Sequence, residues 1–76
     1  MKDSTKKINL EEIIDEVLDD YIYRIEEATP TFAKKIKEYS TVYVSEIIDC
    51  KYQDKELTDE EYEFIVDEVL NRYEAL

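Results

Sequence analysis

Glycine and histidine are absent from this chain of 76 residues, and proline and cysteine each occur once. Without glycine, the tight β-hairpin turns and phosphate-cradling loops that need this residue are excluded. The single cysteine, Cys50, cannot form an internal disulfide, and without histidine or a CxxC pair the ligands of a structural zinc site are missing. The stability of so short a domain must therefore come from helix packing or from self-association.

Groups that carry out catalysis are equally scarce. With no histidine and one cysteine, the nucleophilic triads of hydrolases cannot be assembled. The many carboxylates would need a pocket that tunes their acidity, and a domain of this size has little room for one. Cys50 is expected to be a small buried residue near Phe32 and Tyr43. The sequence therefore predicts a protein that is not an enzyme and that holds no cofactor or metal.

Long hydrophobic runs are also missing. No stretch approaches the ~18 consecutive apolar residues of a membrane-spanning helix, so we expect no contact with the membrane interior. Residues 1–8 contain Lys2, Lys6 and Lys7 without an apolar stretch after them, which is unlike a secretory signal. They are expected to form a flexible basic lead before a single helical domain at 9–76. A reduced, cytoplasmic location is the default expectation.

Acidic residues dominate the charge of the chain. Asp and Glu number 21 against 10 Lys and Arg, so the net charge is −11. Nucleic acid and anionic membrane surfaces would repel such a chain, and its natural partner is a basic protein surface. Apolar residues make up 43% of the composition, with seven tyrosines and two phenylalanines, which is typical of a folded domain and not of a disordered acidic tail.

Apolar residues recur at the 3.6-residue period of an amphipathic helix in three segments. These segments span residues 9–28, 30–52 and 58–75. Asn9 and Thr58 are N-cap candidates, and each is followed three residues later by a glutamate, the spacing of a capping box. Pro30 fits the first turn of the second helix. The pattern predicts an all-α fold, a small three-helix bundle with short connections.

The middle segment has two interpretations over part of its length. Residues 41–44, Thr-Val-Tyr-Val, are rich in β-branched side chains and are either helical or a short strand. A lone strand would have no pairing partner elsewhere in the chain. If the segment is one helix, its apolar face comprises Phe32, Ala33, Ile36, Tyr39, Tyr43, Val44, Ile47 and Cys50.

The first and last helical segments resemble each other. Residues 13–21 read IIDEVLDDY and residues 65–73 read IVDEVLNRY, with six of nine positions identical. Either a helix was duplicated, or two acidic amphipathic helices share the same pattern. One pair of segments is too few to indicate a repeat architecture.

Negative charge is concentrated in these same two helices. Residues 10–28 carry net −7, residues 59–76 carry net −6, and the intervening residues 29–58 carry none. The first helix spans ~28 Å, so its charges lie ~4 Å apart, and two such helices side by side approach the one charge per ~1.7 Å of duplex DNA. In a three-helix bundle we expect these two helices to be neighbours ~8–10 Å apart.

Both acidic helices place carboxylates and one aromatic residue opposite their apolar face. Like charges at i,i+4, such as Glu12 with Glu16, cost helix stability, and lysines at these positions would stabilise the helix instead. We therefore expect this acidic surface to contact a partner. It comprises Glu12, Asp15, Glu16, Asp19, Tyr23, Glu26, Glu60, Phe64, Asp67 and Glu68.

An acidic surface of this kind imitates a nucleic-acid backbone. The first hypothesis is an inhibitor or decoy that blocks a basic, nucleic-acid-handling protein without binding nucleic acid itself. By analogy of class, and not by family resemblance, phage and mobile-element anti-defence proteins such as anti-CRISPR and antirestriction inhibitors work in this way. An acidic immunity or antitoxin protein would use the same surface. A surface that only keeps a small domain soluble is the remaining interpretation.

A second hypothesis is a structural or regulatory helical module, such as a homodimer or an adaptor subunit. Val42, Ile48 and Tyr52 lie at or beyond the edge of the apolar face of the middle helix. They are expected either to pack against a neighbouring helix or to form a homodimer seam with apolar contacts.

Overall fold

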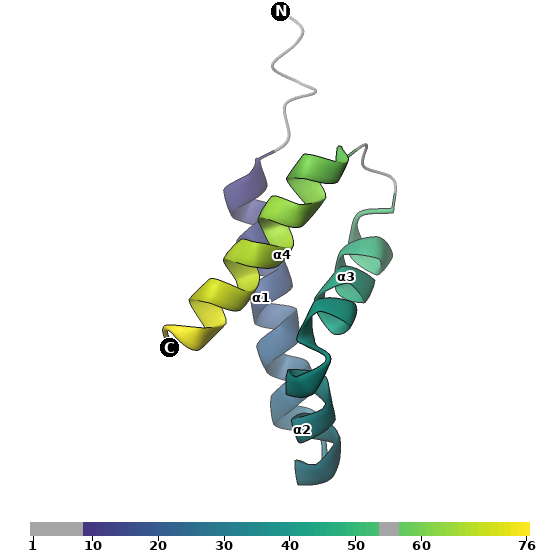
Figure 1. Cartoon of the computed structure of the whole chain (residues 1–76), viewed down its shortest axis with the longest axis vertical. Coiled ribbons are helices and arrows are strands. Elements are labelled where there is room, and N and C mark those ends of the chain that lie inside the picture. The colour runs from purple at the N-terminus through teal and green to yellow at the C-terminus, as the bar shows by residue number, and fades with distance from the viewer. Residues whose placement is uncertain (1–8, 54–56) are drawn as a thin grey trace, which may run out of the picture.

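The computed structural model describes residues 9–53 and 57–76, and all regular structure in these two ranges is helical. The elements are α1 (Leu10–Glu27), α2 (Pro30–Glu38), α3 (Ser40–Lys51) and α4 (Asp59–Glu74). Figure 1 shows α4 crossing in front of α1, with α2 and α3 forming a bent third column. The all-α prediction is confirmed, but three helices was wrong for this part of the chain because the middle one is divided. The predicted basic lead at 1–8 lies outside the described residues.

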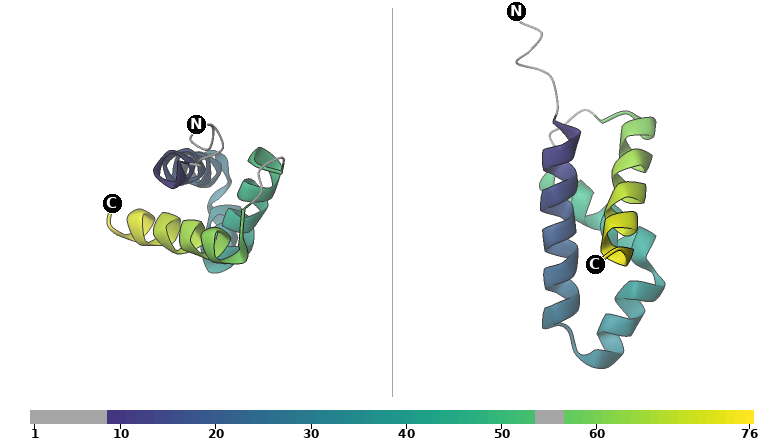
Figure 2. Two further views of the ribbon diagram at one scale, coloured as in Figure 1. Left: turned by 90° about the horizontal axis from the view of Figure 1, so that it is seen from above. Right: turned by 90° about the vertical axis from the view of Figure 1, so that its left-hand side faces the viewer.

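The predicted middle helix breaks at Tyr39, which is both the C-cap of α2 and the N-cap of α3. The Tyr39 backbone (φ −110°, ψ 42°) leaves the helical region, although its N–H still donates to the carbonyl oxygen of Lys35 at 3.0 Å. Ser40 and Thr41 follow directly, and both are weaker helix formers than the Lys-rich turn before them. The bend allows α2 and α3 to follow different directions, as the side view in Figure 2 shows.

Residues 41–44 belong to α3, so the helical interpretation of this segment is confirmed and the strand is excluded. Val42 is 61% exposed whereas Val44 is 0% exposed. Alternate residues of a strand share one face, while residues two apart on a helix point in nearly opposite directions. The contrast between the two valines therefore follows from the helical backbone.

Side-chain caps begin three of the helices. The Asn9 side chain accepts a hydrogen bond from the backbone N–H of Glu12 at 3.3 Å, and Thr29 caps α2 in the same way. At α4 the predicted capping box is complete, because the Thr58 hydroxyl accepts from the Glu61 N–H at 3.1 Å and the Glu61 carboxylate accepts from the Thr58 N–H at 2.9 Å. These bonds satisfy backbone donors that a helix N-terminus leaves unpaired.

The core is built mainly from the apolar faces of α1, α3 and α4. Its buried members are Ile13, Ile14, Val17, Tyr21, Ile36, Val44, Ile47, Ile48, Ile65, Val66 and Val69. The two similar segments supply matching parts of it, since Ile14 and Val17 of α1 occupy the same places in the pattern as Val66 and Val69 of α4. Their tyrosines meet: the rings of Tyr21 and Tyr73 pack edge to face, with centroids 5.2 Å apart.

The single apolar face expected for residues 30–52 does not exist, because the break at Tyr39 turns the two halves apart. Ile36, Val44 and Ile47 are buried, but Phe32 and Tyr39 are exposed. Cys50 is also exposed, which corrects the expectation that it is a buried residue of the core. The 3.6-residue period places residues on one face only while the helix is continuous, so the break changes which residues face the core.

The two valines of α3 allow a test of this fold. Val44→Ala removes two buried carbon atoms and should lower the free energy of unfolding by about 2 kcal/mol. Val42→Ala makes the same chemical change at an exposed site of the same helix, so it should alter stability by less than about 0.5 kcal/mol. Urea denaturation of both variants provides the measurement. Equal losses would contradict the helix, since both valines would then face the core.

Candidate functional site

The two acidic helices lie side by side. α1 packs more extensively against α4 than against any other element, and both helices run in the same direction (Figure 2). Burial of Ile13, Ile14, Val17 and Tyr21 turns the remaining positions of α1 outward, as the burial of Ile65, Val66 and Val69 does on α4. The prediction that the two acidic helices are neighbours is therefore confirmed.

Arg72 of α4 joins the two acidic faces where the helices meet. Its guanidinium lies 3.0 Å from a carboxylate oxygen of Glu11, 3.1 Å from Asp15 and 3.5 Å from Glu68. The hydrogen bond to Glu11 raises the pKa of Arg72 above its already high value, so the cation is permanent. Asp15 and Glu68, both predicted to contact a partner, are thus brought together but are partly neutralised within the chain.

The sequence interpretation missed this bridging role of Arg72, although the two similar segments contain a signal for it. Asp20 of α1 occupies the place in the pattern that Arg72 takes in α4. The alignment therefore marks a single reversal of charge between two otherwise acidic helices. A lone arginine on such a helix is the residue expected to face the neighbouring carboxylates.

A second set of cations lies on the other side of α1. Asp20 accepts a hydrogen bond from Arg24 at 3.0 Å and lies 3.7 Å from the ammonium nitrogen of Lys51. Lys51 ends α3, so this cluster links α1 to α3. Neither Asp20 nor its two partners belonged to the predicted surface.

Glu16 is drawn towards α3 as well. The hydroxyl of Tyr52, at the C-terminal end of α3, donates a hydrogen bond to the Glu16 carboxylate. Tyr52 is half-buried and packs against the core, so it reaches Glu16 from a fixed position. Glu16 is therefore part of a contact within the chain, and it is less available to a partner than the sequence pattern indicated.

The remaining predicted carboxylates face outward. Across 9–53 and 57–76, no ion pair involves the carboxylates of the set Glu12, Asp19, Glu26, Glu60 and Asp67, and all five residues are exposed. The aromatic residues predicted to lie among them, Tyr23 on α1 and Phe64 on α4, are exposed too. The exposed face of α1 is acidic from the α4 side to the α3 side, which is broader than the single stripe expected.

The residues of the predicted homodimer seam do not form one surface. Ile48 is 1% exposed and belongs to the core of the monomer, while Tyr52 is engaged with Glu16. Val42 alone is freely exposed. Ile48 and Tyr52 therefore follow the other interpretation, since both pack against neighbouring parts of the same chain, and Ile48 points inward instead of lying at the edge of the apolar face.

Other kinds of site find little support in the described part of the chain. Within it, no group of three or more Cys, Asp or Glu side chains is arranged to hold a metal ion. None of its helices combines the length and the apolar character needed to cross a bilayer. Comparison with protein-family models, with curated proteins and with solved structures finds no match to this chain. Function must therefore be inferred from the surface itself.

The cation that joins the acidic helices offers a test of their packing. Arg72→Gln leaves Glu11, Asp15 and Glu68 facing one another without a positive charge, so the melting temperature should fall at low ionic strength. The loss should shrink as salt screens the carboxylates. Arg24→Gln is the matched control, since Asp20 keeps Lys51, and it should have a smaller effect. An equal loss for Arg72→Gln at low and high salt would show that the cation is not needed to relieve repulsion.

Tyr52 is expected to make the free energy of unfolding decrease at alkaline pH. Burial raises the pKa of its phenol, and the adjacent Glu16 carboxylate raises it further. Because an unfolded tyrosine titrates near 10, the stabilising effect of the neutral phenol is complete below about pH 10 and is lost as the pH rises towards the folded-state pKa. Tyr52→Phe should therefore make unfolding less sensitive to pH above about 10, with a residual dependence from Tyr21 and Tyr62, whose pKa values burial also raises. Urea midpoints measured across this range test the effect, and unchanged sensitivity would refute it.

Proposed function

We propose that this protein binds a basic surface of another protein through the acidic faces of α1 and α4, and that it excludes nucleic acid from that surface. The observation that carries the proposal is the placement of the cations. Arg72 lies where α1 meets α4, and Arg24 and Lys51 lie where α1 meets α3. The outward carboxylates of Asp19, Glu26 and their neighbours face solvent instead.

Electrostatics favours a protein partner. Net charges of −7 on residues 10–28 and −6 on residues 59–76 repel nucleic acid and attract Lys- and Arg-rich grooves. A groove that binds a nucleic-acid backbone is lined with regularly spaced cations, and two adjacent acidic helices present carboxylates at a comparable density. A small inhibitor of nucleic-acid-handling enzymes, of the anti-CRISPR or antirestriction kind, would use the surface in this way.

The charge reversal Asp19→Lys with Glu26→Lys tests the proposal. Both residues are exposed on α1, and neither belongs to an ion pair of the described chain, so the double variant should fold normally. Proteins retained from a lysate at low salt on the unchanged chain should elute as salt rises, and the chain should displace labelled DNA from them. The double variant should compete at least about tenfold less well.

A matched double variant separates this surface from overall charge. Glu38→Lys with Asp49→Lys changes the net charge by the same amount at exposed positions on α2 and α3, outside the acidic faces of α1 and α4. The Tyr62 hydroxyl loses its bond to Asp49 but keeps the one to the carbonyl oxygen of Ser45. This double variant should compete almost as well as the unchanged chain. Two outcomes would refute a decoy role. One is a retained protein that binds DNA and this chain at the same time, and the other is an equal loss of competition with DNA in the two double variants.

A further inference from the structure

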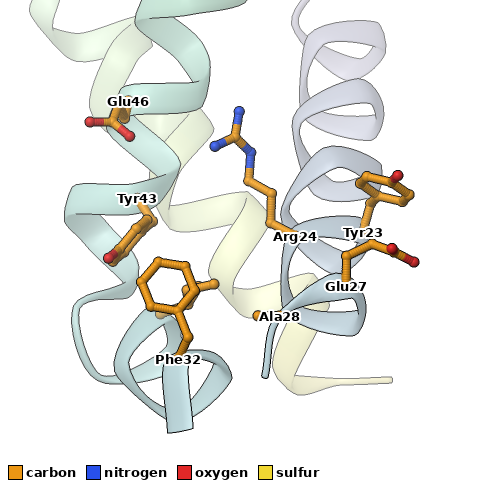
Figure 3. A pocket seen from close by; sticks show the side chains of 8 residues that line it. Tyr23, Arg24, Glu27, Ala28, Phe32, Tyr43 and Glu46 are labelled. Atoms are coloured by element: carbon orange, nitrogen blue, oxygen red, sulfur yellow. The ribbon is translucent and has the colours of Figure 1, made fainter. Parts of the chain in front are cut away.

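An open groove separates the C-terminal half of α1 from the α2–α3 column. It encloses about 460 Å³, which is in the range of sites that take a small ligand or a bulky side chain. Its apolar walls comprise Ala28, Ile36 and the rings of Phe32 and Tyr43, with Tyr23 at the α1 edge. Figure 3 shows Phe32 standing beside Tyr43, while Arg24 reaches from α1 towards α3.

The groove leaves a fixed aromatic surface open to solvent. The rings of Phe32 and Tyr43 pack edge to face with centroids 6.0 Å apart, so the wall that they form is ordered. Phe32 is nevertheless 46% exposed, and Tyr23 is more exposed still. Exposed, well-packed aromatic residues beside a cavity are typical of the centre of a protein interface.

The charges around the groove identify the kind of side chain that fits. Glu27 of α1 and Glu46 of α3 lie on its opposite sides, and neither belongs to an ion pair within residues 9–53 and 57–76. Arg24 also lines the groove and pairs with Asp20 at 3.0 Å, a carboxylate that Lys51 shares. Two glutamates against one arginine leave the rim net negative around an apolar floor. It complements an apolar side chain that has lysine or arginine beside it.

The groove is continuous with the acidic surface. Tyr23 belongs to both, and Glu26 and Glu27 follow it within one turn of α1. A basic protein lying along the acidic face of α1 would reach the opening of the groove at the end of that face. Apolar contact there would add to the electrostatic attraction, which by itself distinguishes poorly among basic partners.

We infer that the groove receives a bulky apolar side chain of the partner, flanked by basic residues, and so selects among basic proteins. This inference rests on the proposed function, because the acidic surface brings the partner to the groove. Phe32 and Tyr43 supply the apolar contact, and Glu27 and Glu46 hold the flanking cations.

Two synthetic peptides of equal charge test the inference on the full chain. One has a central phenylalanine and the other has a central serine, and in both peptides three lysines precede this residue and three follow it. The phenylalanine peptide should bind about tenfold more tightly. It should also shift the amide resonances of Ala28, Phe32, Ile36 and Tyr43 in NMR spectra, while the serine peptide shifts only those of the acidic surface.

Matched variants identify the groove as the cause. Phe32→Ser should abolish the preference for phenylalanine, whereas Val42→Ser, an exposed apolar residue outside the groove, should retain it. Glu46→Lys should weaken the phenylalanine peptide more than Glu63→Lys does, since Glu63 is exposed on α4 away from the groove. Circular dichroism checks that each variant is folded. If a variant is unfolded, the two peptides compared on the unchanged chain still test the preference for phenylalanine.

The possible outcomes separate this inference from the proposed function. Equal binding of both peptides, weakened by salt and by Asp19→Lys with Glu26→Lys, would overturn the groove inference and leave the acidic surface standing. Binding of neither peptide at low salt would overturn both. Sedimentation of the unchanged chain as a dimer that Phe32→Ser dissociates would assign the groove to a second copy and overturn the inference.

Discussion

Two helices of like charge pack against each other in this protein, and the rest of the structure depends on that contact. α1 and α4 each bury isoleucine and valine side chains completely, and the rings of Tyr21 and Tyr73 close the interface. Full burial of one such aliphatic side chain contributes about 1.5–3 kcal/mol, whereas a pair of like charges on a helix surface costs only a few tenths of a kcal/mol. The apolar faces therefore determine the packing, and the carboxylates are placed on the outside as a consequence.

Cations lie at the contacts between the helices. Arg72 lies between carboxylates of α1 and α4, and Lys51 lies beside Asp20 where α1 meets α3. The Arg72 guanidinium pairs with Glu11, Asp15 and Glu68, which relieves repulsion at the helix contact and leaves the carboxylates farther out on the two faces unpaired within the described residues. The same distribution explains why a domain with net charge −11 keeps a continuous acidic surface on α1: its few basic side chains in this region are used between helices.

The bend at Tyr39 creates the remaining surface features. A straight helix over residues 30–52 would have kept one face against α1, and Phe32 would have belonged to the core. Because the chain turns between α2 and α3, Ile48 moves into the core, while Phe32 is left beside an open groove together with Tyr43. The groove opens at the end of the acidic face of α1, so electrostatic attraction and apolar contact become available to one partner at once.

Local residue patterns determined most of the architecture in advance. The apolar period, the caps at Asn9 and Thr58 and the absence of glycine were sufficient for an all-α fold and for the positions where α1 and α4 begin, because these features act within one or two helical turns. The break at Tyr39 was not predictable in this way: the β-branched residues at 41–44 left helix and strand open, and a local pattern does not show where a helix bends, because that depends on what it packs against. The bridges of Arg72 and Tyr52 span 57 and 36 residues of sequence. Only the packing of the helices brings such distant side chains together, so the tertiary structure alone decided which carboxylates are paired and which face a partner.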